Sequence, residues 1–312
     1  MVKSRILVIG SSNIDFVCRM PFVPEQGQTI MSDDTYAFVP GGKGANTAVA
    51  AARLGGDVVF CTRVGNDSYG EQLYEKYKAE GIDTRFLVMD KTARTGLAVI
   101  MVEKTGNNRI VVYPGANINL NDNDAEAAFT AYPDALIMQL EIDKETVIAA
   151  SRYAREKGTK VFLDAGPVST DFPLEQLGEL EVLSPNETET RILTGITPNS
   201  SANCLRACVA LMSRVPCKYV VLKLGDRGCY VYDGTHCHHI APIDVGTPVD
   251  TTAAGDAFTA ALAVRYMSNG ANIIDACEFA NAVGGYVVTK AGAFPSLPTT
   301  KELRDFLENS EE

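Results

Sequence analysis

Short apolar strands alternate with helical segments along most of this 312-residue chain, and no other feature limits the possible fold as strongly. The apolar runs predict strands at 6–9, 58–62, 86–89, 135–140, 160–164, 181–184 and 218–224. The segments between them predict helices at 45–54, 70–80, 122–131, 144–157 and 187–193. Repeated units of this kind predict an α/β fold with a doubly wound, mostly parallel sheet that is flanked by helices.

Two stretches interrupt this alternation and predict a second, smaller sheet. Residues 95–102 and 109–113 flank a polar turn and predict a β-hairpin, which has to leave the parallel sheet. The preceding stretch at 21–39 is turn-rich and predicts a strand excursion. We expect 13–42 and 95–113 to form a β-sheet lid within one domain that spans 1–312. The exposed edges of such a lid favour a homodimer joined through it.

Charge and cysteine usage limit the partners and the compartment. With 28 Lys and Arg against 39 Asp and Glu, the formal net charge is −11, which argues against a nucleic-acid or anionic-membrane partner. The eight cysteines include no C-x-x-C pair, as expected for reduced thiols in the cytoplasm. We expect no secretory signal and no membrane span, because the apolar runs are too short for either.

A loop of small residues precedes an apolar helix predicted at 257–267. The loop ends in Ala253, Ala254 and Gly255, whose backbone N–H groups can approach a ligand closely, and a helix start favours an anion. Asp256 follows directly, where a carboxylate can take a proton from a hydroxyl that attacks a phosphoryl group. The same residues also fit an ordinary helix start that is capped by one of the two preceding threonines.

A second glycine-rich loop, at 40–46, leads into the first predicted helix. Gly41, Gly42 and Gly44 allow close backbone approach, while Lys43 and Asn46 supply hydrogen-bond donors. The loop lacks the G-x-x-x-x-G-K-[ST] spacing of a P-loop, so a nucleotide would be bound by another arrangement. A flexible turn with a surface lysine is the alternative interpretation.

Polar side chains follow the ends of several predicted strands. Asn13 and Asp15 come just after the first strand, and Glu141 and Asp164 follow two later strands. Ligands of open α/β sheets bind at this edge, and Asn13 and Asp15 suit the hydroxyl groups of a small polyol. All four are also ordinary turn or capping residues.

Two further segments suit a nucleotide and its metal. Asn186 and Glu189 lie three residues apart in an opening helical turn, where oxygen ligands suit Mg²⁺ directly or through water. Taken alone, this segment favours a simple capping box. Gly225 and Gly228 form a turn after the strand predicted at 218–224 and suit passage beneath nucleotide phosphates.

The order of these segments resembles the ribokinase-like carbohydrate kinases over essentially the whole chain. The matching segments are 10–15, 41–46, 64–67, 114–117, 139–141, 186–189, 225–228, 250–256 and 290–296. Each segment alone is weakly specific, whereas the ordered set is highly specific. The resemblance implies ATP-dependent phosphorylation of a sugar's primary hydroxyl, with D-ribose to D-ribose 5-phosphate the leading reaction. Another small sugar or a nucleoside is the alternative substrate. A non-catalytic sugar-binding regulator is disfavoured by the intact Gly255-Asp256 pair.

The resemblance also implies a role for particular residues. It makes Asp256 the catalytic base and Ala253, Ala254 and Gly255 the anion hole. The implied sugar contacts are Asn13, Asp15, Gly41, Gly42, Lys43, Asn46, Glu141 and Asp256. The implied ATP-site residues are Asn186, Lys223, Gly225, Gly228 and Asn281, with Glu189 near Mg²⁺ through water. The implied K⁺ site is formed by Asp250, Thr252, Val287, Lys290, Gly292 and Ser296, mostly through backbone carbonyls. Hydrogen bonds that merely tie two loops together also explain Asp250 and Ser296.

Two positions depart from the pattern of this family. The segment Leu163-Asp164-Ala165-Gly166-Pro167 stands where these kinases usually carry Asn-Pro-Ala-Pro, which bears on the sugar preference. Lys223 stands where a smaller hydroxyl residue is commoner, which bears on the phosphate contacts.

Overall fold

The predicted apolar runs build one large sheet. In the computed structural model, which describes residues 3–32, 34–105, 107–268 and 272–310, a nine-stranded sheet has the order β13-β12-β11-β10-β9-β8-β1-β4-β5. Its strands are β1 (Arg5–Ile9), β4 (Asp57–Gly65), β5 (Leu87–Asp90), β8 (Ala135–Met138), β9 (Lys160–Asp164), β10 (Leu180–Ser184), β11 (Cys217–Lys223), β12 (Cys229–Tyr232) and β13 (Cys237–Ile240). All pairs from β11 to β5 are parallel, whereas β12 and β13 add an antiparallel end.

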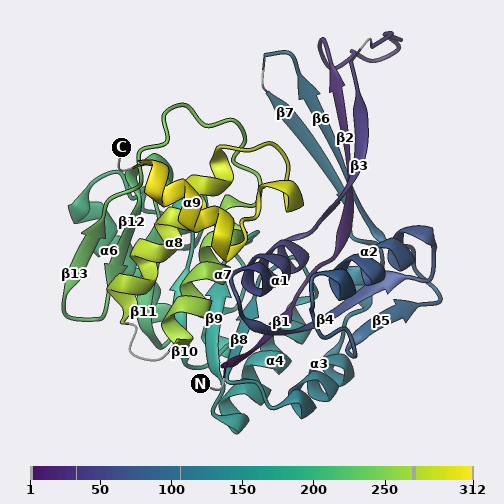
Figure 1. The fold of residues 1–312 in the computed structure, drawn as a ribbon. Helices are drawn as coiled ribbons and strands as arrows, with labels where there is room; N and C mark the ends of the chain where they lie inside the picture. Colours follow the sequence, from purple (N-terminus) through teal and green to yellow (C-terminus); the bar gives the residue numbers. More distant parts are fainter. Residues whose placement is uncertain (1–2, 33, 106, 269–271, 311–312) are drawn as a thin grey trace.

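Helices cover both faces of this sheet (Figure 1). They are α1 (Lys43–Arg53), α2 (Ser68–Ala79), α3 (Asp122–Ala128), α4 (Lys144–Lys157), α5 (Glu187–Thr194), α6 (Ser201–Arg214), α7 (Ala254–Met267), α8 (Ile273–Val288) and α9 (Thr300–Ser310). Within the described ranges, no helix combines the length and the apolar character needed to cross a membrane.

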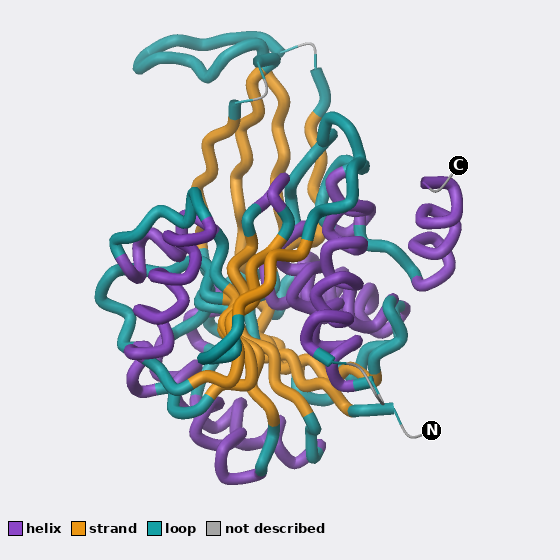
Figure 2. The backbone as a smooth tube through the Cα atoms, turned by 90° about the vertical axis from the view of Figure 1, so that its left-hand side faces the viewer, coloured by secondary structure: helices purple, strands orange, loops and turns teal. Residues whose placement is uncertain are grey.

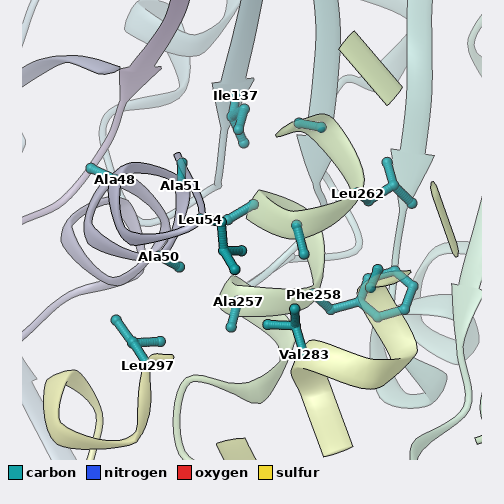
Figure 3. Close-up of a cluster of buried hydrophobic side chains, with 14 of the residues drawn as sticks. Ala48, Ala50, Ala51, Leu54, Ile137, Ala257, Phe258, Leu262, Val283 and Leu297 are labelled. Atoms are coloured by element: carbon teal, nitrogen blue, oxygen red, sulfur yellow. The ribbon is translucent and has the colours of Figure 1, made fainter. Parts of the chain in front are cut away.

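Alternate residues of the central strands enter two separate cores. In β1, Ile6 and Val8 pack with α1, α7 and α8, whereas Leu7 and Ile9 pack with α3, α4 and α6. This alternation explains why the strand is apolar throughout, because both of its faces are buried. Alanines of α1 and α7 enter the same core, where Figure 3 shows Ala51 and Ala257, and their small side chains let the two helices approach closely.

The interrupting stretches form the predicted lid. A four-stranded sheet has the order β3-β2-β6-β7 and consists of β2 (Asn13–Met20), β3 (Tyr36–Gly41), β6 (Gly96–Glu103) and β7 (Asn108–Tyr113). Its strands project from the body that holds the large sheet and the helices (Figures 1 and 2). The lid joins that body where β2 and β3 meet the first turn of α1, and Asn13 there pairs with Gly41.

Several boundaries differ from the sequence-based prediction. The helix predicted from 257 begins at Ala254, and the helix predicted at 122–131 ends at Ala128 and continues as a 3₁₀ turn over Phe129–Ala131. The sequence patterns did not identify α6, α8 or α9. The helix α8 was missed because its own residues are small or apolar on most of its sides, which leaves little amphipathic periodicity to detect.

Candidate active site

The start of α7 is open and lacks a side-chain cap. Ala253 occupies the N-cap position with φ 63°, a left-handed conformation that costs an alanine about 1 kcal/mol. The N–H of Ala254 donates to the Thr251 carbonyl at 3.3 Å. Among the described residues, no acceptor pairs with the N–H groups of Gly255 and Asp256. The alternative of a threonine cap is therefore wrong, and two amides remain open toward a ligand.

Asp256 is buried opposite the start of α1. Its carboxylate is held by two donors, with Asn46 Nδ2 at 2.8 Å from Oδ2 and Lys43 Nζ at 3.3 Å from Oδ1. The nearby Asp256 raises the pKa of Lys43 above its usual value, so this lysine stays charged. Two helix starts that are 210 residues apart in the sequence thus meet at one carboxylate.

The polar residues after β1 lie against the glycine loop before α1. A Cβ at Gly41 would lie 2.1 Å from the carboxylate of Asp15, and a Cβ at Gly42 would lie 2.9 Å from the backbone nitrogen of Asn13. Gly42 also has φ 93°, which favours glycine. Glu141 joins the group by accepting from the Lys43 N–H at 3.1 Å. Close packing therefore explains the glycines, and the polar residues converge as the sequence predicts.

Asp15 has the most perturbed carboxyl group of this cluster. Burial, together with the charges of Glu141 and Asp256, raises the pKa of Asp15 to about 7. Asn46 adds a buried acceptor, because its Oδ1 has no hydrogen-bond partner in the described structure. A cluster rich in oxygen acceptors suits the donating hydroxyl groups of a polyol.

Asn117 completes this cluster, although sequence reasoning assigned it no contact. Its Nδ2 donates to Asn13 Oδ1 at 2.7 Å and to the Pro114 carbonyl at 2.9 Å. Its Oδ1 accepts from the Ser12 N–H at 2.8 Å. Asn117 therefore fixes the orientation of Asn13. The available signal was its place in the segment 114–117, which matches the family pattern.

A large cavity lies beside the start of α7. It has a volume of about 750 Å³ and is bounded by the turn after β11, the loop at 242–248 and one face of α8. Gly225, Gly228 and Asn281, which the resemblance assigns to the ATP site, line this cavity, and Gly284 adds an open stretch of helix surface. Asn281 Nδ2 donates to the backbone carbonyls of Ile240 and Ala241, which ties α8 to the end of β13. The volume is in the range of small-molecule and cofactor sites.

A smaller cavity of about 360 Å³ connects this space to Asp256. The residues that line both cavities are Lys223, Gly225, Thr251 and Gly255. Asn186 and Glu189 lie on the wall of the smaller cavity and form the capping box that the local sequence favours. Burial raises the pKa of Glu189, while the positive charge of Lys223 opposes that change.

The loops predicted to hold K⁺ are connected through Asp250. Its carboxylate accepts from the N–H of Thr252 and from the N–H of Gly292, each at 2.9 Å. The hydroxyl of Ser296 donates to the Ala293 carbonyl at 2.7 Å instead of reaching Asp250. The loop-tying interpretation therefore holds for Asp250 and is wrong for Ser296. Val287 and Lys290 lie at the end of α8 and just beyond it.

The fold and this arrangement of cavities define a class of enzyme. The chain matches the pfkB family carbohydrate kinases over residues 3–300 and belongs to that family. It is similar to the ribokinase of Haemophilus influenzae, with 34% identity over 312 residues that cover 99% of this chain and 100% of the relative. It is also 29% identical to the deoxyribokinase of Salmonella typhi, over 98% of this chain and 99% of the relative.

A solved structure gives the same result at the level of the fold. The ribokinase of Arabidopsis thaliana, complexed with ribose and ATP, superimposes with a TM-score of 0.89 and 30% identity. The superposition covers 98% of this chain and 99% of that one.

Proposed function

We propose that this carbohydrate kinase transfers the terminal phosphoryl group of ATP to the primary hydroxyl of D-ribose and releases D-ribose 5-phosphate and ADP. The observation that carries the proposal is the position of Asp256. It lies beside the open amides of α7, between a cluster of polyol-binding character and a cavity large enough for a nucleotide. The ribokinase names of similar full-length chains support ribose as the acceptor.

In the proposed reaction, Asp256 accepts the hydroxyl proton as the sugar oxygen attacks the terminal phosphorus. Of the predicted anion hole of Ala253, Ala254 and Gly255, the Ala254 N–H already donates to the Thr251 carbonyl. The amides of Gly255 and Asp256 therefore stabilise the charge that develops on the phosphoryl oxygens. Asn13, Asp15 and the other residues of their cluster orient the sugar. The bond from phosphorus to the bridging oxygen breaks, and ADP leaves through the larger cavity.

The chain's residues fit a role for Mg²⁺ through water. Across the part of the chain that the structure describes, no three His, Cys, Asp or Glu side chains gather to hold a metal ion. Both carboxylate oxygens of Glu189 already accept hydrogen bonds from Asn186, at 2.7 and 2.9 Å. An Mg²⁺ ion that keeps its water ligands could therefore bind near Glu189 through one of those waters. When bound with ATP, Mg²⁺ neutralises phosphate charge.

We further propose that K⁺ binds between the loops that Asp250 joins. The contributing residues are Asp250, Thr252, Val287, Lys290, Gly292 and Ser296. Their backbone carbonyls suit a monovalent cation, which would fix the loop that leads to the anion-binding amides. The direct support is the link from Asp250 to Gly292, because it places the two loops in contact.

The remaining proposals concern the whole chain. We propose one domain over 1–312 with the lid at about 13–42 and 95–113, and a homodimer formed through that lid. We also propose a cytoplasmic location, because all eight cysteines are free thiols and the substrates are ATP and a free sugar.

A coupled assay of ADP release over a panel of sugars and nucleosides with Mg·ATP tests the reaction. D-Ribose is expected to have the highest kcat/KM. A higher kcat/KM for deoxyribose, another sugar or a nucleoside would show that ribose is not the preferred acceptor, while the assignment as a kinase would stand. Tight sugar binding without turnover on any acceptor would instead support a binding regulator.

A further inference from the structure

The two positions that depart from the family pattern contact each other. Asp164 is the last residue of β9 and Lys223 the last residue of β11, and β10 lies between these strands. Lys223 Nζ donates to Asp164 Oδ2 at 2.6 Å, and the two side chains are only 11% and 2% exposed. The charge introduced at one position is therefore matched by the opposite charge at the other.

A third residue fixes this ion pair against α7. Thr259 Oγ1 lies 2.9 Å from Asp164 Oδ2 and 3.1 Å from the Gly255 carbonyl. The other oxygen, Asp164 Oδ1, is buried and has no hydrogen-bond partner among the described residues. Buried ion pairs generally add little stability compared with apolar replacements. A contribution to folding alone is therefore a weak explanation for this pair.

The ammonium group of Lys223 lies where the two cavities join. Lys223 lines both cavities, and its Nζ is 3.5 Å from the point where a side chain on Gly255 would begin. The absence of that side chain leaves the ammonium close to the open start of α7. The Lys43 ammonium reaches the start of α7 from α1 and contacts Asp256. Two ammonium groups therefore border the place where the proposed reaction transfers phosphate.

We propose that Lys223 binds the terminal phosphates of the nucleotide and that Asp164 is a positioning residue that holds the Lys223 ammonium at the junction. This inference rests on the proposed function, because it assumes that the larger cavity holds ATP. An ammonium has three N–H donors, so Lys223 can bond a phosphate oxygen while it keeps its bond to Asp164. Thr259 keeps Asp164 in place, so that Asp164 continues to hold the Lys223 ammonium while phosphate binds.

The test compares nucleotide binding by four variants without any sugar. They are Lys223→Met, Asp164→Asn, the double variant and Lys218→Met. Lys218 is the matched control, because it lies on the same strand, pairs with Glu181 at 3.0 Å and lines neither cavity. The double variant avoids leaving Asp164 buried without a counter-charge. Calorimetry with Mg²⁺ uses two probes, AMP and a non-hydrolysable ATP analogue, and thermal unfolding checks that each variant folds.

Lys223→Met and the double variant are expected to bind the ATP analogue about 10- to 100-fold more weakly, which is typical for one charged hydrogen bond. Their affinity for AMP should change less than about twofold, because AMP lacks the terminal phosphates, and Lys218→Met should match the wild type. If the double variant binds the ATP analogue as tightly as wild type does, the proposed role of Lys223 is wrong. The same conclusion follows if its affinity for AMP falls as much as its affinity for the ATP analogue.

The role of Asp164 is tested by the kinetics of Asp164→Asn. The charge of Lys223 remains in this variant, so KM for ATP should stay within about threefold while kcat falls about tenfold, as expected for a misplaced group. An unchanged kcat would overturn the positioning role. If the wild-type protein binds neither probe, the nucleotide site itself is wrong and the proposed function falls together with this inference. If the wild-type protein binds both probes and the variants bind them equally well, only the inference about Lys223 and Asp164 is wrong, and the proposed function stands.

Discussion

Asp256 lies among hydrogen-bond donors, whereas Asp15 lies among carboxylates. Asn46 and Lys43 both donate to the Asp256 carboxylate, which fixes the side chain of the proposed base in place. Asp15 faces the charges of Glu141 and Asp256 in a buried environment and retains its proton up to about pH 7. Two aspartates of one cluster therefore have different neighbours.

Replacing Asp256 with asparagine tests the proposed base. Asp256→Asn keeps the size of the side chain but cannot accept a proton, so kcat should fall about 10²- to 10⁴-fold. Ribose affinity, measured by calorimetry, should remain within a few-fold. A variant that keeps more than half of the wild-type kcat would exclude Asp256 as the base.

Replacing Asp15 tests the pKa shift through stability. The folded pKa of about 7 lies above the ordinary value of 3.8, so Asp15 favours the folded state at low pH. That contribution is lost as the pH rises from about 4 through 7. Asp15→Asn cannot ionise, and its free energy of unfolding relative to wild type should increase by a few kcal/mol between pH 5 and pH 8. Urea unfolding at both pH values measures this change, and an equal difference at the two values would contradict it.

At the scale of elements, α7 and α8 line the large cavity that we propose for the nucleotide. The loop before α7 is tied to the segment after α8 by the bond from Gly292 N–H to Asp250. The two helices pack against each other in the core shown in Figure 3. A shift of the segment after α8 would therefore move Asp250, and with it the loop that leads to the amides at the start of α7.

The proposed K⁺ site belongs to this link. Activity in K⁺ should exceed activity in tetramethylammonium at equal ionic strength, because an ordered loop preorganises the amides. Asp250→Ala should abolish that difference. Asp233→Ala, which removes a similar turn contact to Thr235 N–H at 2.8 Å, serves as the control. Equal wild-type rates in both salts, with saturating substrates, would rule out the ion.

Gly284 tests the nucleotide cavity from the side of α8. A Cβ at this helical position would meet no atom within 4 Å, and the residue lines the large cavity. Gly284→Leu should therefore fold normally and raise KM for ATP at least about tenfold by filling the space. Gly284→Ala is the control and should raise stability by up to about 1 kcal/mol. Normal ATP kinetics in the leucine variant would show that the nucleotide binds elsewhere.

At the scale of the whole molecule, the lid is the part that lacks a covering layer (Figure 1). All residues of β7 are exposed, and Ile110, Val111, Val112 and Tyr113 are each at least 44% exposed. On the other edge strand, Tyr36 and Phe38 are 67% and 47% exposed. Apolar edge strands of this kind favour pairing with another sheet.

The lid dimer is tested by one charge in β7. Wild-type protein at micromolar concentration should show twice the chain mass of 33.5 kDa by light scattering, and Val111→Lys should shift it toward the monomer. Val209→Lys provides the control, because Val209 is 50% exposed on α6, away from the lid. A wild-type monomer would disprove the dimer.

Hydrophobic periodicity was sufficient for most of the large sheet. The predicted helix 144–157 and strand 160–164 have the observed bounds, because each has a clear local pattern and defined ends. The hairpin was also visible as two apolar runs around a polar turn, and it led to the lid. Small glycine-rich loops marked both helix starts, since close backbone approach restricts the residue type locally.

Tertiary packing decided what local patterns do not contain. The chain alone gives no reason to pair Asp164 with Lys223, or Asn117 with Asn13, because parallel strands and distant loops bring these residues together. The local sequence likewise did not predict the uncapped start of α7, where Ala253 has a left-handed conformation. The elevated pKa of Asp15 arises from burial and from two carboxylates that are distant in sequence. Local chemistry therefore selects the candidate residues, whereas long-range packing sets their distances and charges.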